Sequence, residues 1–210
     1  MRGGVTLAAA REAGRSLMDY RREQLPLLLS REGCRYVAGH FPYSRAAHRD
    51  FSSDWRFITI LREPVDRWLS QYFYNRYKNA ESFRTDLDLA TYVARAQRST
   101  AFSSKLTDIS RYQFWRDPVR SAIDTLEKLD AVGCLERVDE FKEDLGELVG
   151  AEIQIGHERP NPCPVEERRK MVTPEIRRRV EELCVDDTKI YRHALGMVDR
   201  RSENRARSKD

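Results

Sequence analysis

The segment that decides the fold is residues 58–74, ITILREPVDRWLSQYFY. It opens with apolar, mostly β-branched residues, a composition typical of a strand buried on both faces of a parallel sheet. Pro64 suits the first position of a helix, where its missing N–H costs nothing. The apolar residues that follow recur at helical intervals: Val65, Trp68, Leu69, Tyr72 and Phe73. The sequence therefore predicts a strand that passes directly into a helix.

Short apolar runs and helical spacings continue on both sides of this segment. Strands are predicted over residues 35–38, 57–61 and 131–135. Helices are predicted over residues 7–24, 119–129 and 138–149, after Pro64, and from Thr173 onward, and Pro26 is expected either to end the first of them or to begin the next turn. Three prolines within residues 156–170 predict a loop. The alternation predicts an α/β fold, a short parallel sheet flanked by helices, in one domain of residues 1–199 with a charged, disordered tail at 200–210.

Composition restricts the class of protein. The 210 residues suffice for one domain with a real core. The formal net charge of +4 is too small to indicate a nucleic-acid-binding protein, although it is compatible with an anionic ligand. No apolar run could span a membrane and no signal peptide is recognisable, so the chain as given is predicted to be cytoplasmic. The four cysteines match no zinc-binding spacing, which favours buried thiols, and no metal is expected.

Arg62 and Ser70 are candidates for binding a phosphate. In parallel sheets ligands bind beyond the carboxyl ends of the strands, where Arg62 is predicted to lie, and the helix that begins at once points its N–H groups to the same place. A guanidinium with a hydroxyl eight residues later suits a terminal phosphate dianion. The alternative, equally consistent with the spacing, is that Arg62 pairs with Glu63 or Asp66 and that Ser70 is ordinary helix surface.

The same stretch resembles the 3′-phosphate-binding segment of PAPS-dependent sulfotransferases, in particular the carbohydrate group that includes the heparan sulfate 2-O-sulfotransferases. In that family a strand ends in Arg-Asp/Glu-Pro, and a serine eight residues after the arginine completes the site. Three further segments are similar: residues 36–43 (YVAGHFPY), residues 132–137 (VGCLER), and residues 173–191 with Asp187 and Tyr191. The resemblance implies a fold related to P-loop kinases, with Arg62 and Ser70 on the 3′-phosphate of the sulfate donor PAPS or its product PAP.

His40 is the residue that the resemblance assigns to catalysis. It occupies the place of the histidine that serves as the base in the 2-O group, and an imidazole suits taking a proton from an acceptor hydroxyl. Taken alone, a histidine after a strand is more often structural. His48 is a second candidate. The implied acceptor is a carbohydrate or another hydroxyl compound, and an anionic one would be compatible with Arg45, Arg49 and Arg67, although charged side chains are usually only solvated.

The start of the chain departs from the family pattern. The family opens with a strand and a Lys-Thr-Gly-Gly-Thr-Thr-Leu-like loop around the 5′-phosphosulfate, whose lysine neutralises charge on the bridging oxygen. Residues 1–7 (MRGGVTL) resemble the second half of that loop, with Gly3, Gly4 and Thr6 as the remaining contacts, Met1 in place of the lysine, and the first strand missing.

Two hypotheses about function follow. One is an enzyme that transfers a sulfuryl group from PAPS to a hydroxyl. The other is a catalytically impaired or vestigial module that still binds PAPS or PAP but lacks the loop lysine. A P-loop nucleotide kinase is disfavoured, because a complete Walker loop and Mg²⁺-binding acids are not found in the sequence.

Overall fold

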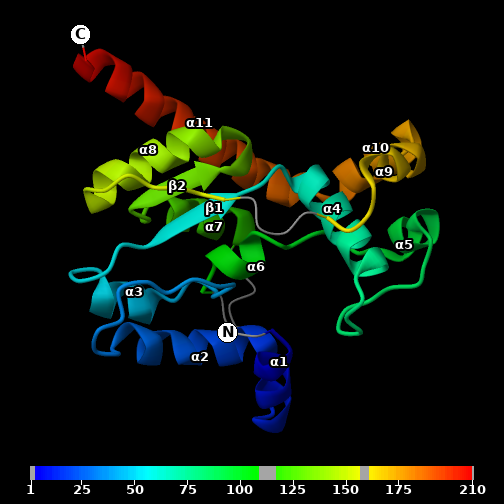
Figure 1. The fold of residues 1–210 in the computed structure, drawn as a ribbon, viewed down its shortest axis with the longest axis horizontal. Helices are drawn as coiled ribbons and strands as arrows, with labels where there is room; N and C mark the ends of the chain where they lie inside the picture. Colours follow the sequence, from blue (N-terminus) through cyan, green and yellow to red (C-terminus); the bar gives the residue numbers. More distant parts are fainter. Residues whose placement is uncertain (1–2, 109–116, 157–160, 210) are drawn as a thin grey trace. The chain divides into compact units, whose positions relative to one another are not determined.

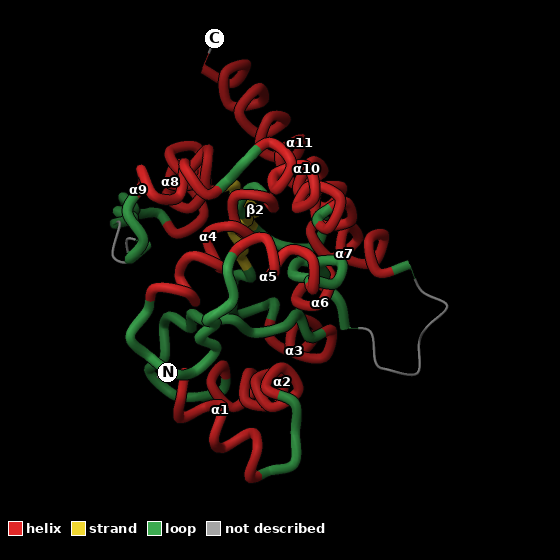
Figure 2. The backbone as a smooth tube through the Cα atoms, turned by 90° about the vertical axis from the view of Figure 1, so that its right-hand side faces the viewer, coloured by secondary structure: helices red, strands yellow, loops and turns green. Residues whose placement is uncertain are grey.

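The structure is a computed structural model that describes residues 3–108, 117–156 and 161–209. It is a mostly helical α/β protein with a two-stranded parallel sheet, β1 (Ile58–Leu61) next to β2 (Ala131–Cys134), flanked by helices. Figure 2 shows these short strands among the helices. The predicted short parallel sheet with flanking helices is therefore confirmed at this level. The chain divides into two compact units: unit 1 is Met1–Ile58 with Ala101–Asp130, and unit 2 is Thr59–Thr100 with Ala131–Asp210.

The helices of unit 1 are α1 (Gly3–Glu12), α2 (Leu17–Leu29), α3 (Arg45–Phe51), α6 (Ser103–Leu106) and α7 (Pro118–Leu126). The single helix predicted over residues 7–24 is in fact two helices, because Gly14 takes a left-handed conformation with φ of 63° and Ser16 caps a new helix. Pro26 lies inside α2 and does not end it. The helix continues past the proline because Leu25 and Leu29 are buried in a small apolar cluster.

Residues 35–38 are not a strand, contrary to the sequence prediction. They form an irregular segment in which Tyr36 is 77% exposed and Val37 packs against the apolar cluster of α2. The composition is typical of a strand, but no neighbouring strand pairs with the segment among the described residues. Strand propensity without a pairing partner is a weak determinant of structure.

The elements of unit 2, besides most of β1, are α4 (Pro64–Tyr77), α5 (Leu89–Arg95), β2, the short 3₁₀ helix η1 (Leu135–Arg137), α8 (Val138–Val149), α9 (Val165–Met171), α10 (Pro174–Leu183) and α11 (Val185–Lys209). Helices α8 and α11 both contact β2, and α10 contacts α4 and α5, as can be followed in Figure 1. Two predicted helix starts are confirmed: Glu63 caps α4 ahead of Pro64, and Thr173 caps α10 ahead of Pro174.

The two strands differ in burial. Every residue of β2 is buried, whereas Ile58 and Ile60 of β1 are 41% and 40% exposed. The prediction that β1 is buried on both faces is therefore wrong. In the described part of the chain β1 has a partner on one edge and is not covered on the face that carries these isoleucines.

Two polar segments are more ordered than the sequence predicts. The predicted loop over 156–170 includes helix α9, although residues 157–160 lie outside the described residues. Helix α11 continues to Lys209 through the stretch predicted to be disordered. Ion pairs to α8 hold this part of α11, since Arg205 contacts both Glu143 and Asp144 at 3.0 and 3.2 Å.

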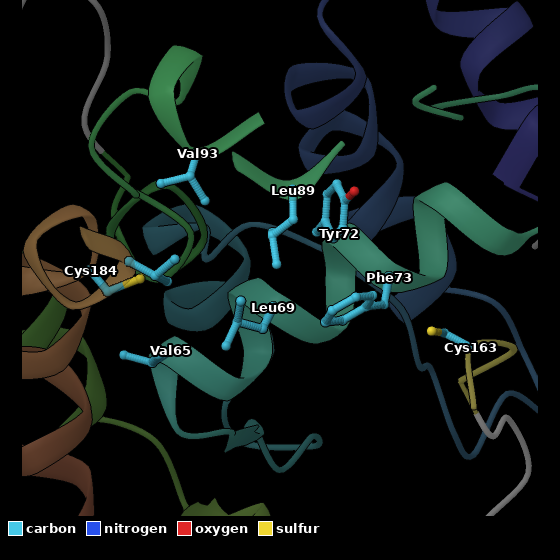
Figure 3. Packing of buried hydrophobic residues seen from close by; sticks show 9 residues of the cluster. Val65, Leu69, Tyr72, Phe73, Leu89, Val93, Cys163 and Cys184 are labelled. Atoms are coloured by element: carbon cyan, nitrogen blue, oxygen red, sulfur yellow. The ribbon is translucent and has the colours of Figure 1, made fainter. Parts of the chain in front are cut away.

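The main apolar core of unit 2 surrounds α4. Figure 3 shows its buried side chains, which come from α4, α5, α10 and the segment before α9: Val65, Leu69, Tyr72, Phe73, Leu89, Val93, Cys163, Val180 and Cys184. The helical spacing that predicts α4 thus also identifies the face that it buries. Because this face is packed, α4 is held in a fixed orientation, and with it the partly buried Ser70.

Candidate functional site

Arg62 follows the last residue of β1 and is half-buried. In the described part of the chain its guanidinium makes no hydrogen bond or ion pair. The acids that could have neutralised it are engaged elsewhere. The Glu63 carboxylate accepts the Asp66 N–H at 2.7 Å and so caps α4, while the Asp66 carboxylate pairs with Arg177 of α10 at 3.3 Å. The alternative in which Arg62 pairs with Glu63 or Asp66 is therefore wrong for this structure.

Ser70 lies on α4 and contacts a residue that sequence analysis did not single out. The Asn161 side-chain nitrogen Nδ2 donates to the Ser70 carbonyl at 2.9 Å and to Ser70 Oγ at 3.3 Å. The Cys163 N–H in turn donates to Asn161 Oδ1 at 3.1 Å. Asn161 is separated from Ser70 by 91 residues and lies in a proline-rich segment predicted as a loop, so no local pattern could have identified the contact.

Glu136 joins three elements near the carboxyl ends of the strands. It lies in η1, directly after β2. Its Oε1 accepts the Glu63 N–H at 2.9 Å, and its Oε2 accepts the Tyr191 hydroxyl of α11 at 2.7 Å. Burial and the hydrogen bond to Glu136 both raise the pKa of Tyr191. This bridge holds the backbone next to Arg62.

Arg67, in the first turn of α4, belongs to a more buried group. Burial is the main cause that lowers the pKa of Arg67, the charge of Arg62 adds to this, and the nearby Asp187 opposes it. Asp187 is completely buried and accepts a hydrogen bond from the Ser99 hydroxyl. The charge of Arg67 is thus offset inside the protein by Asp187, which leaves Arg62 as the more accessible cation of the two.

The remaining predicted site residues lie in unit 1, whereas Arg62 and Ser70 lie in unit 2. His40 is exposed, and its carbonyl accepts a hydrogen bond from Arg21 at 3.4 Å. Gly3, Gly4 and Thr6 lie in helix α1, where the sequence predicts the second half of a loop, and the Thr6 side chain is buried. The structure therefore places Arg62 and Ser70 together in unit 2 and the other candidates in unit 1.

His48, the second candidate for a base, has a structural environment. It is half-buried on α3, with its Nε2 3.2 Å from the Lys128 carbonyl and its ring centroid 5.0 Å from that of Phe57. Arg49 on the same helix pairs with its neighbour Asp50. These contacts account for His48 without a ligand.

Two open surface depressions of unit 2 are lined by residues other than Arg62 and Ser70. One of about 550 Å³ is bordered by Glu143, Glu147 and Glu152, whose charges would repel an anion. One of about 310 Å³ lies beside Trp68 and Tyr92. Among the described residues no group of three or more His, Cys, Asp or Glu side chains could hold a metal ion, and no helix there is long and apolar enough to cross a membrane.

Comparisons of the chain with protein-family models, with curated proteins and with solved structures found no match. A functional conclusion for this chain therefore depends on its own residues and their geometry. Within unit 2 these are an accessible guanidinium at the end of β1, a hydroxyl eight residues later on α4, and a carboxylate that fixes the backbone between the two strand ends.

Proposed function

We propose that this chain is a sulfotransferase-type protein that binds the 3′-phosphate of PAPS with Arg62 and Ser70. In this proposal it transfers the sulfuryl group to a hydroxyl of a carbohydrate acceptor. The observation that carries the proposal is that the Arg62 guanidinium makes no hydrogen bond or ion pair with any described residue, while its neighbouring acids Glu63 and Asp66 both have other partners. A half-buried cation without an internal counter-ion is well suited to an anionic ligand.

The residues present fit a phosphate monoester. The Arg62 guanidinium can donate two parallel N–H bonds to phosphate oxygens, and its position beyond β1 is where ligands of parallel sheets bind. Ser70 can add a hydroxyl donor, because its oxygen already accepts from Asn161 and its proton is uncommitted in the described structure. Glu136 holds the Glu63 N–H and so keeps the backbone beside Arg62 in place.

His40 is the proposed base. As the acceptor oxygen forms its bond to sulfur, the bond from sulfur to the phosphate oxygen of PAPS breaks, and PAP leaves. The acceptor hydroxyl loses its proton in this step, and His40 takes it. Because the base acts on the acceptor, His40→Ala should abolish sulfuryl transfer while leaving PAP affinity nearly unchanged.

Calorimetric titration with PAP tests the proposal. Removing Arg62 by Arg62→Ala should cost about 1.5–3 kcal/mol of binding free energy, because a charge-assisted hydrogen bond to phosphate is lost, and Ser70→Ala should cost less. Arg120→Ala is the matched control, since it removes one positive charge from an exposed ion pair in unit 1. Equal PAP affinities for the Arg62 and Arg120 variants would contradict the proposal.

A transfer assay with labelled PAPS separates the two functional hypotheses. PAP binding that depends on Arg62, together with transfer that depends on His40, supports the enzyme. PAP binding that depends on Arg62 with no transfer to any hydroxyl acceptor supports the module that binds the nucleotide without turnover.

A further inference from the structure

The hydrogen bonding of the Ser70 hydroxyl differs from that of two other hydroxyls, Thr107 directly after α6 and Thr125 in α7. Thr107 and Thr125 each donate to the carbonyl four residues earlier, at 2.7 and 3.1 Å. This is the usual arrangement in helices, because that carbonyl is the nearest acceptor. Ser70 makes no such bond, and within the described structure its hydroxyl donates to no acceptor.

The orientation of the Asn161 amide explains the difference. The Cys163 N–H donates to Asn161 Oδ1, so the oxygen of the amide faces Cys163 and the nitrogen faces Ser70. Cys163 is 1% exposed and packs in the core around α4, where Figure 3 shows its side chain beside α4. The amide is therefore held by a residue that is itself fixed by packing.

This orientation determines the role that Ser70 can take. A serine hydroxyl has one proton to donate and two lone pairs that can accept. The Asn161 N–H approaches one lone pair of Oγ, so the Ser70 proton points away from Asn161. A second N–H···O bond from the same amide nitrogen to the Ser70 carbonyl fixes the backbone beneath the side chain. Ser70 is thereby set as a donor, which is the role that a bound anion requires.

We infer that Asn161 is a positioning residue that orients the Ser70 hydroxyl as a donor to the 3′-phosphate. The inference rests on the proposed function and adds a residue to it. Asn161 does not touch the ligand. It acts through Ser70, and the buried Cys163 in turn fixes Asn161.

The test compares the affinities of PAP and adenosine 5′-phosphate, which lacks the 3′-phosphate, by calorimetry. Asn161→Ala should lower PAP affinity about tenfold and leave the affinity for adenosine 5′-phosphate unchanged, because only the 3′-phosphate uses Ser70. Asn161→Asp keeps the acceptor for the Cys163 N–H. Its carboxylate accepts a hydrogen bond from the Ser70 hydroxyl and repels the phosphate, so PAP affinity should fall by about 10–100-fold. Adding Asn161→Ala to Ser70→Ala should cause no further loss.

The control is Asn75→Ala, which removes an asparagine that makes side-chain hydrogen bonds on the same helix and should preserve the preference for PAP. Equal losses of both ligands in the Asn161 variants would show a structural role and overturn the inference. The inference would also be overturned if the Asn161 variants kept normal PAP affinity while Ser70→Ala bound PAP weakly. A wild-type chain that does not prefer PAP over adenosine 5′-phosphate would instead refute the proposed function, and the inference with it.

Discussion

Replacing Gly133 with alanine tests the packing of β2 against α8, which supports the end of the strand that precedes Glu136. Gly133 is a buried residue of β2, and Phe141 of α8 packs over it. A Cβ atom at Gly133 would lie 2.3 Å from Cδ2 and 2.4 Å from Cγ of Phe141, far below van der Waals contact. Phe141 is 4% exposed and cannot simply turn into solvent. Gly133→Ala should therefore destabilise the protein by about 1–3 kcal/mol, the usual cost of overpacking a core.

Urea unfolding followed by circular dichroism measures this cost, and a double-mutant cycle identifies its cause. Phe141→Ala alone should cost about 3–5 kcal/mol. In that background the two closest ring atoms are gone and the Cβ of residue 141 remains at 2.9 Å, so Gly133→Ala should cost less there than in the wild-type protein. Gly156→Ala is the control, because no atom of the described residues lies within 4 Å of its Cβ position. If Gly133→Ala is as harmless as Gly156→Ala, or if the two β2–α8 substitutions are additive, the steric reasoning is wrong.

Two further predictions concern the cysteines. Burial raises the pKa of Cys134 to about 11 and that of Cys184 to about 12, from 9.0 for an exposed thiol. The contribution of these two thiols to the free energy of unfolding is therefore fully present below pH 9. It is lost as the pH rises toward 11–12, because the thiols of the unfolded chain ionise at lower pH than those of the folded chain. The fall in the free energy of unfolding between pH 8.5 and 10.5 should be smaller in Cys184→Ala, and an equal fall would contradict the assignment. In the folded chain a thiol reagent should label Cys34, which is half-buried, well before Cys134, Cys163 and Cys184, which are buried, and simultaneous labelling of all four would refute this order.

Local signals in the sequence predict the elements that local interactions determine. The junction of β1 and α4 follows from a β-branched run, a proline and a helical spacing, and Thr173 with Pro174 marks the start of α10. The sequence-based prediction of secondary structure fails where tertiary contacts determine the conformation of a segment. The charged end of α11 is helical because Arg205 pairs with acids of α8. Residues 35–38 have no neighbouring strand in the described part of the chain.

In the candidate site, too, the features set by local sequence are predicted and those set by tertiary contacts are not. The motif predicts that Arg62 lies at the end of a strand and that Ser70 lies on the following helix, and both placements are confirmed. The spacing could not decide whether nearby acids neutralise Arg62, because Asp66 finds its partner on a helix more than a hundred residues away. Asn161 was missed for a similar reason, since its contact with Ser70 depends on how a proline-rich segment folds back onto α4.

Neither compact unit is continuous in the sequence, and this has a consequence for the way the protein is made. The residues Ala101–Asp130, which belong to unit 1, interrupt unit 2 between β1 and β2. A ribosome that adds about 5–20 residues per second needs roughly 4–14 s to pass from the end of β1 to the start of β2. During that interval β2, the strand that pairs with β1 in the described structure, has not been made, and the apolar face of α4 lacks its partners Cys163, Val180 and Cys184. The nascent chain must therefore keep this apolar surface from binding other molecules until late in translation.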